Sequence, residues 1–177
     1  MFDKIKINSG ILKRLTATMN KGNKMNYWLM KSEPDEFSID DLKACPNQTE
    51  AWHGIRNYQA RNFMRDAMQI GDQVFFYHSS CKVPGIVGIA EVVTNAYPDS
   101  TAFDPESKYF DPKSDPTKPR WLRVDIRFVE KFNDIIPLSL IKNLPQLADM
   151  YLVSKGSRLS IQPVTAEQWQ AVLMLTP

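Results

Sequence analysis

A short segment in the first third of the chain concentrates side chains that could bind a flat, charged ligand. It begins at Trp52 and reads Trp-His-Gly-Ile-Arg-Asn-Tyr-Gln-Ala-Arg-Asn. Its aromatic, cationic and amide groups include Tyr58, Arg56, Arg61 and Asn57. Aromatic faces beside guanidinium and amide groups at the start of a helix suit a planar, polar and anionic partner. A nucleobase with its phosphate fits this description, although arginine and asparagine at a helix start also serve as caps and solvated surface.

A second segment upstream strengthens this interpretation. It reads Tyr27-Trp28-Leu29-Met30-Lys31-Ser32-Glu33-Pro34. Together the two segments resemble the EVE domain family, whose members typically carry a similar Tyr-Trp-Leu-x-Lys-Ser-Glu-Pro and Trp-x-Gly-[Val/Ile]-Arg-Asn-Tyr-Gln-Ala-Arg-Asn. The resemblance covers about residues 25–177 and continues at Gly71-Asp72, Tyr77-His78-Ser79, Gly85-Ile86-Val87-Gly88, an Asp-Pro-rich stretch and Arg158-Leu159-Ser160-Ile161-Gln162-Pro163.

The resemblance implies a PUA-like barrel that recognises a modified nucleobase, chiefly 5-methylcytosine or 5-hydroxymethylcytosine in DNA. Relatives with the YTH fold read methylated adenine in RNA. A base inside a duplex cannot present its face to a pocket, so it must be flipped out at a cost of a few kcal/mol. A methyl group adds apolar burial of only about 0.8 kcal/mol, so the expected preference for the methylated base is several-fold.

The candidate pocket combines aromatic rings with polar groups that could read the edge of a base. The candidate rings are Trp28, Trp52, Tyr58, Tyr77 and Trp121. The candidate polar groups are Lys31, Ser32, Glu33, Asn57, His78, Ser79 and Gln162. The candidate phosphate-binding residues are Arg56, Arg61 and Arg158, because guanidinium binds phosphate bidentately. Large aromatic side chains are usually buried, so any one of these rings could instead belong to the core.

Signatures of catalysis are largely missing from the sequence. There is no Gly-x-Ser-x-Gly elbow, no phosphate-binding glycine-rich loop and no Rossmann glycine pattern. His78 and Ser79 are neighbours in a predicted strand, where adjacent side chains point to opposite faces and cannot easily form a triad. Cys45 and Cys81 lie in no zinc-binding pattern. We therefore expect a non-catalytic module without cofactor or metal; an enzyme acting on nucleotides or modified bases, or a small-molecule or protein-interaction module, remain the alternatives.

The charge distribution bears on how nucleic acid could be bound. The formal net charge is +2, but residues 1–24 hold six lysines and arginines against one acid. Residues 25–177 therefore carry 16 bases against 19 acids, and bulk attraction to a polyanion cannot supply the affinity. The expected partner is modified DNA or RNA held by a local pocket. We expect no membrane association, a monomer, and a reducing compartment, cytoplasmic or, in a eukaryote, nuclear.

The elements that position these residues can be predicted from periodicity and capping signals. A helix beginning near Tyr58 should bury a stripe made of Ala60, Phe63, Met64, Ala67 and Met68. Strands are predicted over residues 25–31, 73–78, 86–93, 121–132 and 158–164, and further helices over 39–44, 138–143, 146–152 and 166–173. The glycine at position 88 should allow close backbone approach, and the proline-rich residues 98–119 should form a packed loop.

These elements predict an α+β fold, a PUA-like small β-barrel or strongly bent sheet flanked by short helices. Strands and helices do not alternate regularly, which argues against a doubly wound sheet. The chain is divided into a basic N-terminal extension, residues 1–24, which could form an amphipathic helix or be loosely ordered, and one domain, residues 25–177.

Overall fold

The computed structural model describes residues 25–176, so the predicted basic extension lies outside the described residues. One sheet dominates the domain, with strand order β2-β6-β4-β3-β1-β7 and with β5 paired to β6. Strand β1 is parallel to β3, and the remaining pairs are antiparallel. The strands are β1 (Tyr27–Ser32), β2 (Thr49–Trp52), β3 (Gln73–His78), β4 (Gly85–Val92), β5 (Tyr97–Pro98), β6 (Leu122–Pro137) and β7 (Ile161–Val164).

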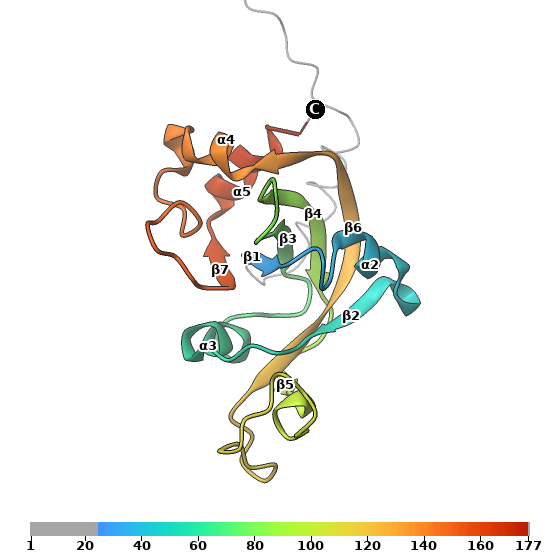
Figure 1. Cartoon of the computed structure of the whole chain (residues 1–177). Helices are drawn as coiled ribbons and strands as arrows, with labels where there is room; N and C mark the ends of the chain where they lie inside the picture. The colour runs from blue at the N-terminus through green and yellow to red at the C-terminus, as the bar shows by residue number, and fades with distance from the viewer. Residues whose placement is uncertain (1–24, 177) are drawn as a thin grey trace, which may run out of the picture.

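Strand β6 bends the sheet. It spans 16 residues and runs from β5 at one end of the molecule to α4 at the other (Figure 1). The first half of β6 pairs with β2 and β5. Strand β4 pairs with β6 from Ile126 to Pro137, and the register of this pairing shifts twice. A Cβ atom on Gly88 would lie 2.2 Å from the carbonyl oxygen of Glu130, which confirms the predicted close backbone approach. The described strands thus form a strongly bent sheet in which β2 and β7 are not paired.

Short helices flank this sheet, as predicted. Two have complete capping boxes, formed by Ser38 with Asp41 and by Thr165 with Gln168. The prediction of a helix over residues 146–152 was wrong. Pro145–Leu147 form a short 3₁₀ helix, and the backbone hydrogen bonds that follow it span three residues, whereas those of an α-helix span four. The α-helices are α2 (Ile39–Ala44), α3 (Tyr58–Asp66), α4 (Leu138–Lys142) and α5 (Ala166–Leu173).

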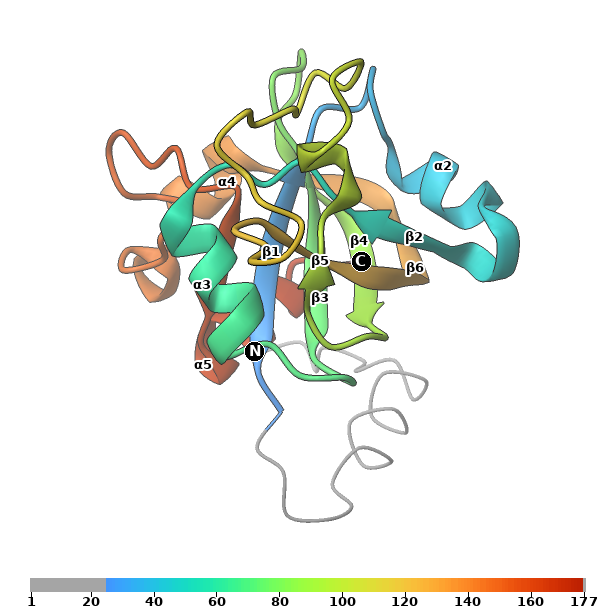
Figure 2. The same cartoon turned by 90° about the horizontal axis from the view of Figure 1, so that it is seen from below.

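Each side of the sheet carries its own hydrophobic core. Trp28 and Met30 of β1 face the core covered by α2 and α3, together with most of the predicted helical stripe. Leu29 faces the opposite core, covered by α4 and α5. Figure 2 shows α3 and the loop after β5 on the near side of the sheet. Because side chains alternate along a strand, this division also decides which polar residues at the end of β1 can meet.

None of the helices in residues 25–176 is long and apolar enough to cross a membrane. The same residues contain no group of three or more His, Cys, Asp or Glu side chains arranged to hold a metal ion.

Candidate nucleic-acid interface

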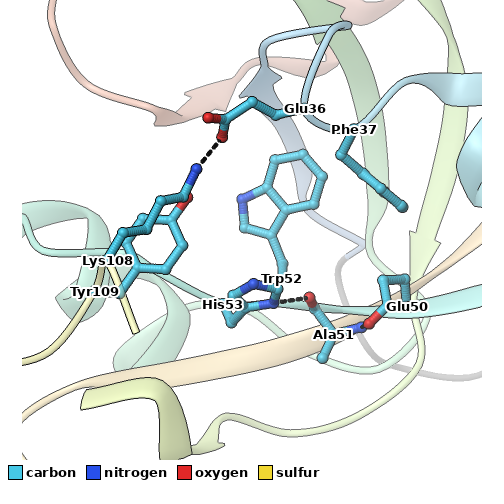
Figure 3. A pocket seen from close by; sticks show the side chains of 8 residues that line it. All are labelled: Glu36, Phe37, Glu50, Ala51, Trp52, His53, Lys108 and Tyr109. Carbon is cyan, nitrogen blue, oxygen red and sulfur yellow. Dashed lines mark hydrogen bonds and ion pairs between the residues drawn. The ribbon is translucent and has the colours of Figure 1, made fainter. Parts of the chain in front are cut away.

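A cavity of about 580 Å³ opens beside the end of β2. Three chain segments surround it: the turn after β1, the end of β2, and the long loop between β5 and β6 (Figure 3). We call this cavity the Trp52 pocket. It is lined by Glu36, Phe37, Glu50, Ala51, Trp52, His53, Lys108 and Tyr109.

The indole of Trp52 occupies the centre of the pocket lining (Figure 3). Only 8% of this residue is exposed, because its ring packs edge-on against Phe76 of β3 with the centroids 5.5 Å apart. Strand β2 fixes its backbone through pairing of Trp52 with Val124 of β6. The ring is therefore both a wall of the pocket and a part of the adjoining core. Among the residues predicted for base binding, Trp52 alone is found in this lining.

Tyr109 forms a second aromatic wall, and its position depends on a glycine. Gly54 has φ +80°, and a Cβ atom there would lie 2.7 Å from Cζ of Tyr109. The Tyr109 ring also meets the His53 ring edge-on at 5.7 Å. Sequence reasoning did not select Tyr109 or His53 for the pocket. The available signal was the proline-rich loop of residues 98–119, which was predicted to be packed and which contains Tyr109.

Charged groups stand on opposite sides of the pocket. Lys108 and Glu36 form an ion pair across its rim, with both side chains more than half exposed (Figure 3). A hydrogen bond to Glu36 raises the pKa of Lys108. At the far side the Glu50 carboxylate accepts hydrogen bonds from the Ala51 N–H at 3.0 Å and the Cys45 thiol at 3.6 Å. The pocket thus combines aromatic walls with carboxylate acceptors and one ammonium donor.

Four predicted polar residues lie at the ends of β1 and β3, where they support the turn that carries Phe37. The Ser32 hydroxyl donates to the Phe37 carbonyl at 2.6 Å, and the Ser79 N–H donates to the Ser32 carbonyl at 2.8 Å. His78 Nε2 accepts the N–H of Ile39 at 3.2 Å, and burial lowers the pKa of His78. Glu33 is exposed and accepts from the Ser80 hydroxyl. The Ser32 and His78 side chains therefore bond directly to the segment that follows β1, and Phe37 of that segment lines the pocket.

Other predicted residues point away from the pocket. Lys31 and Tyr77 lie on the opposite side of the sheet, with the Lys31 ammonium 5.9 Å from the centre of the Tyr77 ring. Burial lowers the pKa of Lys31 and raises that of Tyr77 to about 12. The Gln162 amide, which is also buried there, donates to Ser157 and Leu159, and Arg158 is exposed in the same segment.

Trp28 lies on the pocket side of the sheet but belongs to the core. Only 3% of it is exposed, and its Nε1 donates to the buried carboxylate of Asp72 at 2.9 Å. Its indole face packs near Phe63 of α3, with the ring centroids 5.6 Å apart. A ring enclosed in this way has no face open to a ligand in this conformation, which corrects its placement in the predicted base pocket.

The predicted anion site at the start of α3 is filled by the protein itself. The Arg56 guanidinium pairs with the carboxylate of Asp99 at 2.8 Å, and the same carboxylate accepts the Gly54 N–H. Burial tends to raise the pKa of Asp99, but hydrogen bonds from Arg56, Gly54 and Thr101 outweigh it and hold that pKa below its usual value. Asn57 is the N-cap and accepts the Ala60 N–H at 3.0 Å. Arg56 and Asn57 therefore hold the loop and the helix in place, where an external phosphate was expected.

The two remaining predicted aromatic residues stack on each other: Tyr58 is the first residue of α3, and Trp121 directly precedes β6. Tyr58 is 54% exposed and stacks on Trp121, with the ring centroids 4.9 Å apart. Trp121 is buried, and its Nε1 donates to Asp111 at 2.7 Å. Arg61 donates to the carbonyl of Arg120 at 2.8 Å and lies 5.1 Å from the centre of the Tyr58 ring. These three side chains form one cluster beside the pocket and outside its lining.

Comparison with known proteins adds independent findings. A family model described as the EVE domain matches residues 26–175. Thymocyte nuclear protein 1 of Mus musculus is 44% identical over 189 residues, spanning 97% of this chain and 83% of that protein. The Gallus gallus protein of the same name is 51% identical over 166 residues, spanning 84% of this chain and 68% of that protein.

Solved structures agree with this comparison. A Pseudomonas syringae protein superposes with a TM-score of 0.81 at 56% identity, over 84% of this chain and 98% of that one. The human THYN1 protein, solved in complex with 5-methylcytosine containing DNA, gives a TM-score of 0.81 at 46% identity, over 85% of this chain and 96% of that one. The predicted α+β, PUA-like fold is confirmed.

Proposed function

The chain belongs to the EVE domain family, and from this premise we propose that it binds DNA carrying a modified cytosine, with the flipped-out base held in the Trp52 pocket. The observation that carries the proposal is an open cavity walled by the Trp52 indole and the Tyr109 ring. A similar protein, human THYN1, has been solved with 5-methylcytosine containing DNA. The proposed role is binding, without a chemical step.

The chemistry of the pocket suits a base more than a phosphate. Stacking on an aromatic ring contributes about 1–3 kcal/mol per base and does not depend on which base it is. Discrimination must then come from the edge of the ring, and carboxylates can accept from the N4 amino group of cytosine. Glu36 and Glu50 are the carboxylates in the lining. We assign them this reading role, which excludes thymine because it presents a carbonyl oxygen at that position.

Preference for the methylated base should be modest in a pocket of this kind. Burial of one methyl group contributes about 0.8 kcal/mol, which corresponds to about a four-fold difference in affinity. A larger preference would require that the unmodified base leave a cavity in the complex. Since residues 25–177 carry more acids than bases, the pocket has to supply most of the affinity.

The test is calorimetric titration of the full chain with 2′-deoxycytidine, 5-methyl-2′-deoxycytidine, 5-hydroxymethyl-2′-deoxycytidine and thymidine, and with short DNA and RNA strands carrying each base. We expect binding of the cytosine nucleosides, with the modified forms tighter. Trp52→Ala should weaken this binding by about 1–3 kcal/mol. Failure of the wild-type chain to bind any of these ligands would refute the proposed function.

Trp52 also packs in the core, so its substitution needs a control for stability. Phe75 is fully buried in the core on the opposite side of the sheet, where it stacks on Trp169. Phe75→Leu should therefore lower the melting temperature without changing nucleoside affinity below that temperature. Trp52→Ala should lower both, since removal of a large aromatic side chain costs about 3–5 kcal/mol of stability. Wild-type affinity in a folded Trp52→Ala protein would rule out the stacking role.

A further inference from the structure

A continuous series of aromatic and guanidinium groups leads from the Trp52 pocket to the exposed ring of Tyr58 at the start of α3. We call it the aromatic–guanidinium stack, and it consists of Tyr109, Arg56, Trp121, Tyr58 and Arg61. The Arg56 guanidinium lies 5.8 Å from the Tyr109 ring and 5.6 Å from the Trp121 ring. Trp121 then stacks on Tyr58 at 4.9 Å, and the Arg61 guanidinium lies 5.1 Å from Tyr58.

The inner members of this stack are buried or paired within the protein, whereas the outer members are more accessible to a ligand. Arg56 is paired with the fully buried carboxylate of Asp99, and Trp121 is only 5% exposed. Tyr58, in contrast, is 54% exposed although one face of its ring is covered by Trp121. A large aromatic ring that is held in one orientation and still faces solvent is suited to stacking on a ligand.

Arg61 adds an available positive charge to the outer end. Its two hydrogen bonds go to neutral acceptors, the Arg120 carbonyl and the Asn62 side-chain oxygen, both at 2.8 Å. The neighbouring Arg65 is different, because it pairs with the Asp66 carboxylate at 2.6 Å. The guanidinium of Arg61 is therefore held in place by neutral acceptors, and Asp66, which is paired with Arg65, acts on it only as a weaker coulombic neighbour. A guanidinium held in this way can still contact a phosphate.

From this arrangement we infer that Tyr58 and Arg61 bind the nucleotide next to the base in the Trp52 pocket. The ring of Tyr58 stacks on the flanking base or its sugar, and Arg61 contacts the phosphate. The inference rests on the proposed function, because a strand with one base in the pocket continues past the pocket wall. That wall is Tyr109, and the stack begins there. A stacking contact of this kind is indifferent to the identity of the flanking base.

The experiment compares a free nucleoside with an oligonucleotide, because the nucleoside cannot reach both sites. The probes are 5-methyl-2′-deoxycytidine and a short single-stranded DNA with one central 5-methylcytosine, titrated against the full chain. Tyr58→Ala should lower oligonucleotide affinity about 5- to 150-fold, the range expected for loss of one stacked base. Its nucleoside affinity should stay at the wild-type value. Tyr58→Phe keeps the ring and should keep the oligonucleotide affinity.

Two further variants complete the design. Arg61→Gln should reduce the slope of log affinity against log salt concentration by about one, with no change in nucleoside binding. Tyr151 is a tyrosine of similar exposure, 44%, in the segment after Pro145–Leu147, and Tyr151→Ala is the matched control for removal of a surface ring. It should bind both probes like the wild type.

The outcomes separate this inference from the proposed function. If the wild-type chain binds neither probe, the proposed function fails and the inference fails with it. If the wild type binds both probes and Tyr58→Ala leaves oligonucleotide affinity unchanged, only the flanking site is refuted. A parallel loss of nucleoside and oligonucleotide affinity in Tyr58→Ala would also overturn it, because the ring would then act through the pocket.

Discussion

The guanidinium of Arg56 lies 2.8 Å from the carboxylate of Asp99, whose side chain is fully buried. The same guanidinium donates to the Tyr109 carbonyl and to the Thr101 hydroxyl. One arginine at the start of α3 therefore holds two separate points of the loop between β5 and β6. This loop carries Tyr109 and Lys108 of the Trp52 pocket, so Arg56 ties the second wall of the pocket to the start of α3.

Removal of the Asp99 carboxylate should destabilise the domain. A buried ion pair that loses one partner typically costs about 3–5 kcal/mol, and because Arg56 is partly exposed we expect about 2–4 kcal/mol for Asp99→Ala. Urea denaturation at pH 7 would measure the free energy of unfolding. Asp66→Ala is the matched control, since it breaks the exposed pair with Arg65 and should leave stability unchanged. Equal effects of the two substitutions would contradict this role of Asp99.

Stability should depend on the protonation of His78. Burial lowers its pKa from the ordinary 6.5; Asp40 and Asp41 have smaller effects that raise the pKa, and Lys131 has a smaller effect that lowers it. Because the folded-state pKa is below the unfolded one, the neutral ring stabilises the fold above pH 6.5, and this contribution is lost as the pH falls through the folded-state pKa. We expect the free energy of unfolding to decrease between pH 7 and pH 5.

Substitution of His78 provides the check on this pH dependence. His78→Gln should flatten the profile in that range, whereas His53→Gln should retain the slope that His78 causes. An NMR titration of the wild type should place the His78 transition below 6.5. The accompanying loss of the hydrogen bond from Ile39 would appear as faster amide exchange at the start of α2.

Gly54→Ala should disturb the pocket more than an equivalent change elsewhere. An alanine at φ +80° is strained by about 1–2 kcal/mol, and its Cβ would also collide with the Tyr109 ring. Gly71 is the matched control, because its φ is +96° and a Cβ there would meet nothing within 4 Å. Both variants should lose stability, but only Gly54→Ala should lose affinity for 5-methyl-2′-deoxycytidine. Calorimetric titration of the two variants with this nucleoside measures the difference. Equal affinities would show that Tyr109 is not a pocket wall.

The same substitution at two tryptophans should separate the core from the pocket. Trp28→Phe removes the hydrogen bond to the buried Asp72 carboxylate and should cost about 1.5–3 kcal/mol of stability. Nucleoside affinity of that variant should match the wild type, since Trp28 is enclosed between the sheet and α3. Trp52→Phe should instead weaken nucleoside binding. A loss of affinity in a folded Trp28→Phe protein would return Trp28 to the binding site.

Local sequence determined much of the fold. The capping signals at Ser38 and Thr165 placed the starts of α2 and α5 correctly, because a cap and its partner lie three residues apart. Strand β3 and the buried stripe of α3 were also predicted, since both depend on short-range periodicity. Strands β2 and β5 were missed because they are only four and two residues long and gain their definition from pairing with β6.

The composition of the binding site was set by the sequence only in part. The two segments that mark the family identified Trp52, but they could not show which of the neighbours Lys31 and Ser32 lies on the pocket side of the sheet, because that depends on which side α3 covers. Nor could they show that Arg56 meets Asp99, or that Tyr109 packs on Gly54. Those partners come from a loop more than forty residues away, and they meet only when β6 brings the loop back over the start of α3. Residue types and local periodicity therefore fixed the kind of ligand chemistry we expected. The tertiary structure decided which of those side chains form hydrogen bonds within the protein and which remain accessible to a ligand.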